Sequence, residues 1–156
     1  MSNIYMNWGG TTPPEIKGDV TAAGHVGWIE ISSIQLGRSK AAAADPDGRV
    51  ALSEIVITKD ADMASHPLFN ASLYGEGKKV VIDFVKDDNG KPNVYLSLTL
   101  TGAQVSGWSG SGSGDRPMEN LSLTFTGATY GYSAGVQPHP LQHQNPAFWN
   151  IRPPAR

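Results

Sequence analysis

Two histidines near the C-terminal end of the sequence have the spacing of a metal site. His139 and His143 are four residues apart, and on a helix that spacing places both imidazoles on one face. Pro138 and Pro140 flank His139, however, and proline inside a helix removes a backbone donor and clashes with the preceding turn. The chain also has no cysteine, which excludes a thiolate zinc site. We therefore predict no metal and no other cofactor.

A second candidate is an acidic segment that resembles part of a calcium loop. Asp45, Asp47, Gly48 and Glu54 fall at positions three, five, six and twelve of that pattern. Position one, which must supply a ligand, is Ala43, and the flanking segments have the composition of strands instead of helices. Because Asp-Pro-Asp-Gly is a common turn sequence, we interpret the segment as a turn.

Acid–base or nucleophilic catalysis has no recognisable residue set in this sequence. There is no nucleophile elbow from which a Ser-His-Asp triad can be nominated. The segment 109–115 repeats glycine and serine but lacks the Gly-Lys-Ser/Thr ending of a phosphate-binding loop, so we interpret it as a flexible tip. Glu30 is a lone carboxylate that we expect a neighbour to satisfy. We predict that the protein is not an enzyme.

The composition favours one strand-rich domain over residues 1–156. Charged residues are 17% of the chain, below the ~25% typical of soluble domains, whereas glycine (18) and proline (11) are frequent. The net charge of −2 gives no electrostatic footprint for nucleic acid, and no apolar run approaches the ~18 residues of a membrane helix. We predict neither nucleic-acid binding nor membrane insertion. The first eight residues lack the basic and apolar regions of a secretory signal, so we expect no signal peptide.

The most regular pattern covers residues 93–132, which we predict to form two long strands joined by a glycine–serine turn. In both arms serine and threonine alternate with leucine or phenylalanine, and a period of two places the two kinds on opposite faces of a sheet. The polar, uncharged face consists of Ser97, Thr99, Thr101, Ser122, Thr124 and Thr126. Two interpretations stay open for it. It is an ordinary solvated face selected for strand propensity, or it meets a wide polar lumen or another copy of the chain.

Other strands are expected at 4–8, 25–34, 50–59 and 78–86, with a hairpin turn at Asn89-Gly90. The polar segment 37–49 is expected to be an extended loop at the tip of a hairpin. The tail 133–156 ends in Phe-Trp-Asn-Ile-Arg, and its apolar residues predict that it docks on the domain.

One helix is expected after the third of these strands. Ser65 has the type of a capping residue, Pro67 falls in the first turn where proline is tolerated, and Gly75 is suited to the end. Phe69 and Leu73 are four residues apart, and we expect this apolar stripe to close one end of a barrel.

Several segments carry a family resemblance. One begins at His25 (His-Val-Gly-Trp-Ile-Glu-Ile-Ser-Ser), and another begins at Glu54 (Glu-Ile-Val-Ile-Thr-Lys) and leads into Ser-His-Pro-Leu from Ser65. A third begins at Glu119 (Glu-Asn-Leu-Ser-Leu-Thr-Phe), and the ending from Phe148 completes the series. In this order they resemble the haemolysin-coregulated protein (Hcp) family, the tube protein of type VI secretion systems, over nearly the whole chain.

The resemblance implies a fold and a function. The fold is a small β-barrel of two packed antiparallel sheets with one short α-helix. The function is that of a structural tube subunit, in which homohexameric rings stack into a hollow tube that carries effector proteins in its lumen. The implied partners are a spike protein, a baseplate and a contractile sheath. The tube is assembled in the bacterial cytoplasm and exported by sheath contraction without a signal peptide.

The long loop matches the family's extended loop, which reaches an adjoining subunit or ring. Its candidate ring-stacking residues are Arg38, Lys40, Asp45, Asp47 and Arg49. The chain departs from the family pattern at 7–14 and in its proline-rich approach to the tail, which affects the expected ring edges.

The alternative is a monomeric β-sandwich binding module, for example for carbohydrate. Such modules present exposed aromatic side chains, but Trp8, Trp28, Trp108 and Trp149 are spread along the chain without a common face. Solution mass separates the two hypotheses, since a ring and a monomer differ sixfold.

Overall fold

The computed structural model describes residues 2–38, 50–88, 91–112, 116–132 and 149–152, which form nine strands and one helix. Along the chain these are β1 (Ser2–Trp8), β2 (Ile29–Ile31), β3 (Ser33–Arg38), β4 (Val50–Asp60), α1 (Ser65–Tyr74), β5 (Lys78–Asp88), β6 (Lys91–Ser111), β7 (Met118–Thr124), β8 (Gly127–Tyr132) and β9 (Trp149–Arg152). The predicted mainly β fold with one short helix is confirmed.

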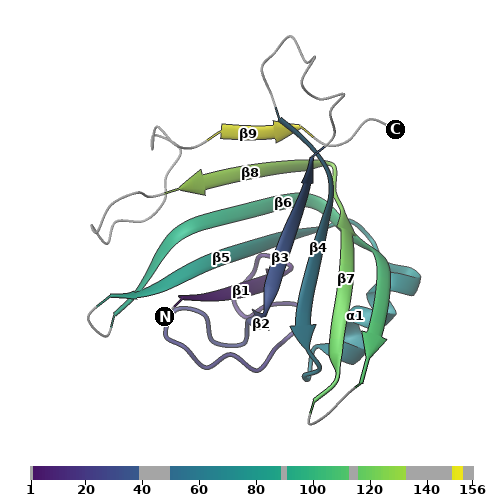
Figure 1. Ribbon diagram of the computed structural model, residues 1–156, viewed down its shortest axis with the longest axis horizontal. Helices are drawn as coiled ribbons and strands as arrows, with labels where there is room; N and C mark the ends of the chain where they lie inside the picture. The colour runs from purple at the N-terminus through teal and green to yellow at the C-terminus, as the bar shows by residue number, and fades with distance from the viewer. Residues whose placement is uncertain (1, 39–49, 89–90, 113–115, 133–148, 153–156) are drawn as a thin grey trace.

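The strands pair in the order β2-β1-β5-β6-β7-β4-β9-β8, and β8 also pairs with β6. The pairings β6-β7-β4-β9-β8-β6 therefore form a closed circuit, seen in the upper and right-hand parts of Figure 1. The remaining strands extend it, with β5, β1 and β2 beyond β6 and with β3 along β4. All these pairs are antiparallel except β4 with β9. The two predicted sheets thus share β4 and β6.

β6 is long enough to serve both sheets because it bends at Gly102. Its first part pairs with β8 from Leu96 to Thr101, and its second part pairs with β7 from Gln104 to Ser111. Gly102 has a φ of 63°, and a Cβ at this position would lie 2.5 Å from Oγ1 of Thr126. Only glycine fits this bend without strain.

The second predicted arm is not one strand. It divides into β7 and β8 at Phe125 and Thr126, where the chain passes from one sheet to the other. The Thr126 backbone N–H and its Oγ1 both donate to the carbonyl oxygen of Thr101, at 2.8 and 3.0 Å. These bonds replace the strand ladder at the corner, a role that alternation alone does not reveal.

The strand expected at 25–34 is also wrong in its first half. His25 to Trp28 form a turn in which the N–H of Trp28 donates to the carbonyl oxygen of His25. Gly27 takes a φ of 82°, which strand residues do not adopt. The remaining residues form β2 and β3, separated at Ser32.

Two predicted loops are shorter than expected. Gly37 and Arg38 belong to β3, and β6 continues through Ser111, which pairs with Met118. β3 and β4 pair as the predicted hairpin, whose tip at 39–49 lies outside the described residues. Likewise β5 and β6 pair as a hairpin up to Asp88 and Lys91, and the turn between them is outside the description. In the tail, β9 pairs with β4 and β8, while 133–148 and 153–156 are not described.

The helix lies where it was predicted, but two of its details are corrected. Ala64 is the N-cap residue, and its N–H donates to Oδ1 of Asp62, so Ser65 is not the cap. Leu68 is the buried residue of α1, whereas Phe69 and Leu73 are 39% and 57% exposed. The face of α1 that meets the core is therefore rotated by about one residue (~100° per residue) from the predicted stripe.

The core lies between the leucine-rich faces of the two sheets. Leu98 and Leu100 of β6 and Leu121 and Leu123 of β7 are fully buried, as the alternation predicted. A second, smaller apolar cluster lies on the other face of β1 and β5 under the irregular segment 9–28. Its members are Tyr5, Val20, Ala22, Trp28, Val85 and Val94.

Candidate functional site

The serine and threonine residues of the predicted polar face lie outside the core. Ser97, Thr99, Ser122 and Thr124 are half-buried, and Thr101 and Thr126 are exposed. Thr99 pairs with Thr129 of β8, whereas Ser122 pairs with Gly107 in the other part of β6. The two groups are therefore not cross-strand neighbours in one register. Thr99 and Thr101 lie on the part of β6 that pairs with β8. Thr126 lies at the corner between the sheets, where it bonds to Thr101.

A buried charge cluster, missed by the sequence analysis, joins β4 and β7 to the start of α1. We call Lys59, Asp62, Ser65, Trp108 and Glu119 the Lys59 cluster. Lys59 is completely buried, and its Nζ donates to Oε1 of Glu119 at 2.7 Å and to Oδ1 of Asp62 at 2.8 Å. Ser65 Oγ donates to the same Glu119 oxygen at 2.7 Å. The cluster ties the first turn of the helix to both strands.

Glu119 is held in its charged form by this cluster. Burial raises the pKa of its carboxyl group, but hydrogen bonds from Lys59 and Ser65, the charge of Lys59 and a bond from Trp108 together lower that pKa below its ordinary value. The Trp108 bond runs from Nε1 to Oε2 of Glu119 at 3.2 Å. Each charge in the cluster thus has partners, which is the condition under which buried charges are tolerated.

A signal for this cluster was present in the sequence. Ile55, Ile57 and Lys59 have the spacing of one strand face, and so do Glu119 and Leu121. A lysine and a glutamate at inward positions of two strands could have indicated a buried pair, although the sequence analysis did not draw that conclusion. In the structure Lys59 lies directly opposite Glu119.

A second polar group, the His25 cluster of His25, Asp83 and Ser97, lies on the other side of the sheet. His25 Nε2 is 2.9 Å from Oδ2 of Asp83, and Ser97 Oγ donates to Oδ1 of Asp83 at 2.8 Å. The His25 ring is buried between Tyr5 and Trp28, with ring centroids 5.1 and 4.5 Å away. Within the described residues, Nδ1 of His25 has no hydrogen-bond partner.

These three residue types occur in serine hydrolases, but their order here is different. In a catalytic triad the histidine lies between the serine and the carboxylate and accepts the serine proton. Here Asp83 lies between Ser97 and His25, and the serine donates to the carboxylate. The cluster therefore fixes the segment around His25 to the sheet and does not activate a nucleophile.

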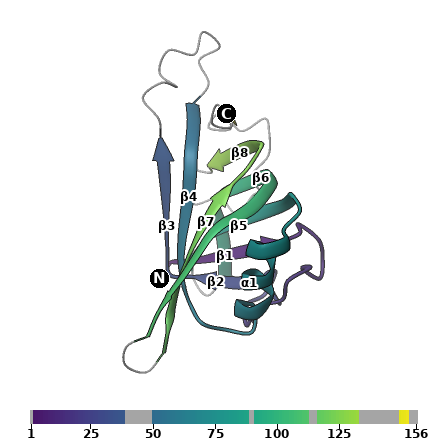
Figure 2. The ribbon, with the colours of Figure 1, turned by 90° about the vertical axis from the view of Figure 1, so that its right-hand side faces the viewer.

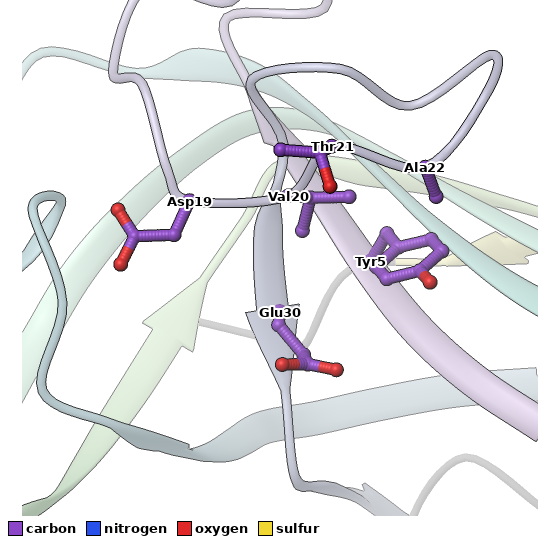
Figure 3. Close-up of a pocket in the computed structure, with 6 residues that line it drawn as sticks. All are labelled: Tyr5, Asp19, Val20, Thr21, Ala22 and Glu30. Atoms are coloured by element: carbon purple, nitrogen blue, oxygen red, sulfur yellow. The ribbon is translucent and has the colours of Figure 1, made fainter.

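Figure 3 shows a shallow pocket of about 270 Å³ with Tyr5 in its lining. The ring of Tyr5 also lies 5.1 Å from the ring of His25, measured between centroids. Asp19, Val20, Thr21 and Ala22 of the irregular segment line the pocket together with Tyr5 and Glu30. Burial and the charge of Glu30 raise the pKa of the Tyr5 hydroxyl, although a bond with Asn3 opposes them. The pocket is smaller than the roughly 300–1,000 Å³ of typical small-molecule sites.

The metal candidates of the sequence lie in segments that the structure leaves out or describes only in part. His139 and His143 are outside the description, as are Ala43, Asp45 and Asp47. Within the described residues no three His, Asp or Glu side chains are placed to hold a metal ion. No helix among these residues is both long and apolar enough to cross a membrane.

A comparison with protein families shows which family the chain belongs to. Residues 5–132 match the sequence profile of the family described as "Type VI secretion system effector, Hcp". The chain belongs to the Hcp family. The matched range contains both polar clusters and ends before β9. Hcp is a family of structural secretion-system proteins that self-associate, and not an enzyme family.

Solved structures of other Hcp proteins share the fold. Hcp1 from Salmonella typhimurium is 23% identical with a TM-score of 0.70, covering 85% of this chain and 86% of its own. A type VI secretion system effector from Yersinia pestis is 20% identical with a TM-score of 0.72, covering 96% and 98%. Secreted protein Hcp3 from Pseudomonas aeruginosa is 17% identical with a TM-score of 0.70, covering 99% and 100%. No curated protein sequence matches the chain.

Proposed function

We propose that this Hcp chain is the tube subunit of a type VI secretion system. Six copies form a ring, rings stack into a hollow tube, and contraction of a surrounding sheath drives the tube out of the cell with effector proteins in its lumen. A spike protein and a baseplate are its further partners. Assembly takes place in the bacterial cytoplasm, and sheath contraction exports the subunit.

The observation that carries the lumen assignment is the uncharged hydroxyl face of β6. Thr99 and Thr101 are accessible on the side opposite the buried leucines, and Thr129 lies beside Thr99. A tube wall must let a folded protein pass without retaining it. A small hydroxyl surface meets this need because it presents neither a large apolar area nor a strong charge. Ser97 contributes less to such a wall, since its hydroxyl is bonded to Asp83.

An arginine scan tests the assignment. Thr99→Arg and Thr124→Arg place a charge on two parts of the proposed wall, where the longer side chains extend into water. Ring formation and thermal midpoint are expected to stay unchanged, while protection of cargo changes because the charges repeat at every layer. If cargo protection is unaltered in both variants, the hydroxyl face does not line the lumen.

Ring stacking is proposed to use the loop 37–49. Arg38 ends β3, and Lys40, Asp45, Asp47 and Arg49 lie outside the described residues. Replacing 39–49 by a short turn is expected to leave the thermal midpoint nearly unchanged, because surface loops tolerate length changes at low cost. Tubes and secretion are expected to be lost. A shortened chain that fails to fold would make the loop a structural element instead.

Native mass spectrometry tests the ring itself. A hexamer has six times the 16.6 kDa mass of the chain. A monomer at micromolar concentration would overturn the proposal and favour the alternative hypothesis of a monomeric binding module. Two of the tryptophans named for that alternative are not available for a platform, because Trp8 is buried in the core and Trp28 packs on His25. Trp108 is 38% exposed beside Phe69.

A further inference from the structure

The irregular segment between β1 and β2 contains a loop that is closed on itself. Figure 2 shows this segment in purple, where it loops out from the body of the strands on the right. We call its last part, residues 18–28, the 18–28 loop. The N–H of Gly18 donates to the carbonyl oxygen of Gly27 at 2.8 Å, and the N–H of Val20 donates to that of Trp28 at 3.1 Å. A side chain at Gly18 would collide with the carbonyl oxygen of Trp28, so the two ends of the loop touch.

The 18–28 loop is attached to the sheet by side chains and not by its backbone. Within the described part of the chain, its backbone hydrogen bonds all run between two of its own residues. Val20 packs in one cluster with Tyr5 of β1 and Val85 of β5, and Nε2 of His25 lies 2.9 Å from Oδ2 of Asp83. Compact loops of this kind are frequently functional. Because no ladder bonds tie the loop to the strands, it can separate from them as a unit.

Two features oppose the closed position of the 18–28 loop. Nδ1 of His25 is buried and has no partner within the described residues, which is unfavourable relative to the same atom in water. The pocket of about 270 Å³ lies between residues 19–22 of the loop and Tyr5 and Glu30 of the strands (Figure 3), so the loop does not pack closely there. Lifting the loop brings Nδ1 into water. The closed and open positions are therefore more evenly balanced than the folded and unfolded sheets.

We propose that the 18–28 loop is a lid that lifts from β1 and β5 while the two sheets stay folded, with His25 as its latch on Asp83. The hydroxyl of Ser97 donates to Oδ1 of Asp83 and holds the carboxylate in place for the latch. Asp83 lies opposite Ser97 in the strand register, and Thr99 follows two residues later on the same face of β6. An open lid therefore uncovers a carboxylate beside the hydroxyl face, and a closed lid covers it. The inference concerns the single chain and does not rest on the proposed ring.

Two single-cysteine variants measure the opening, since the chain has no cysteine of its own. Val85→Cys places a thiol beneath the lid, and Val80→Cys is its matched control in the main core on the same strand. The two valines are 3% and 0% exposed. With iodoacetamide in excess, the thiol of Val85→Cys is expected to react about tenfold faster or more, because a lid opens locally and core strands open only with the whole domain.

Removal of the latch tests the role of His25. His25→Ala removes it from the loop, and Asp83→Ala removes it from the strand while leaving the loop sequence intact. In either background the thiol of Val85→Cys is expected to react about tenfold faster again, a factor that a hydrogen bond to a charged group contributes to an equilibrium constant. The rate for Val80→Cys is expected to stay unchanged. Val26→Ala is the control within the loop, since Val26 is 66% exposed, and it is expected to change neither rate.

Equal rates for the two thiols would overturn the lid. A fast rate for Val85→Cys that neither latch variant changes would also overturn it, because the end of β5 would then open by itself. If Val85→Cys does not fold, amide hydrogen exchange of the unmodified chain decides. The amides of Gly18, Val20 and Trp28 are expected to exchange through one common opening, faster than that of the buried Leu98. Exchange of these amides at the rate of Leu98 would contradict the proposal.

Discussion

The two polar clusters lie on opposite faces of the sheet and differ in how completely their members are paired. The Lys59 cluster is on the core side, where Lys59 and Glu119 face each other across β4 and β7 and bond further to the start of α1. The His25 cluster is on the other side, where Asp83 accepts from Ser97 and contacts His25, whose Nδ1 has no partner within the described residues. The first cluster joins three elements, and all its buried polar atoms have hydrogen-bond partners. The second cluster attaches a turn to a sheet that is already held by its own strand pairing. Most of the polar contribution to stability is therefore expected from the first.

The largest effect is expected from Glu119→Gln. The substitution keeps the shape but removes the charge that faces the completely buried Lys59. Breaking one side of a buried ion pair costs about 3–5 kcal/mol, and we expect a loss near 3 kcal/mol because Asp62 still contacts the ammonium group. Urea denaturation at pH 7 measures it, with exposed Glu76→Gln as control. A loss below about 1 kcal/mol, the range of exposed pairs, would show that the cluster is not the stronger of the two.

A smaller loss is expected from Asp83→Asn. The amide oxygen still accepts a bond, so one of the contacts to Ser97 and His25 is retained. The expected cost is about 1.5–2 kcal/mol, the lower part of the range for a hydrogen bond to a charged group. The same urea experiment measures it. A cost equal to that of Glu119→Gln would remove the proposed difference between the clusters.

The core and the two polar clusters were not equally predictable from the sequence. Alternation predicted the buried leucines of β6 and β7, because a period of two needs no partner to be recognised. The same alternation places Lys59 and Glu119 at inward positions of their strands. This pair can be recognised only when charged residues at inward positions of separate strands are compared. The His25 cluster was not predictable in this way, since His25 lies in a turn and Asp83 on a strand 58 residues later. Nothing in the local pattern of either residue specifies that contact.

The split of the second arm into β7 and β8 was not predictable either. Its cause is the positive φ of Gly102 and the bonds from Thr126 to Thr101, which are tertiary features. The stripe on α1 was placed on the wrong face because Phe69 and Leu73 are more apolar as a pair than Leu68 with Ala71. The structure buries Leu68, packs the partly buried Ala71 against the core and leaves Phe69 and Leu73 exposed.

The pH dependence of stability tests the Lys59 cluster through Glu119. The pKa of Glu119 is lower in the folded chain than its ordinary value of 4.5, so the unfolded state takes up the proton first as the pH falls. The contribution of Glu119 is complete above about pH 4.5 and is lost as the pH falls through its folded pKa. Denaturation series between pH 6 and 3 are expected to show this slope in the wild type and a shallower slope in Glu119→Gln. An unchanged slope in Glu119→Gln would mean that other carboxyl groups govern acid unfolding.

The smallest effect concerns the corner between the sheets, outside both clusters. Thr126→Val removes the side-chain bond to the Thr101 carbonyl oxygen and is expected to cost about 0.5–1 kcal/mol. Thr124→Val is the matched control on the half-buried end of β7, and a smaller change is expected there. Thermal unfolding of both variants measures the difference. Equal effects would mean that Thr126 has no special role at the corner and is an ordinary member of the hydroxyl face that the sequence predicted.

The central claim is a hexameric ring whose hydroxyl face lines the lumen, and a cryo-electron microscopy map of the assembled protein tests it most directly. At a resolution that traces the strands, the account predicts a closed sixfold ring with Thr99 and Thr101 of β6 directed toward the central axis. A map of a ring in which these residues lie on the outer wall, or are covered by the neighbouring subunit, would contradict it.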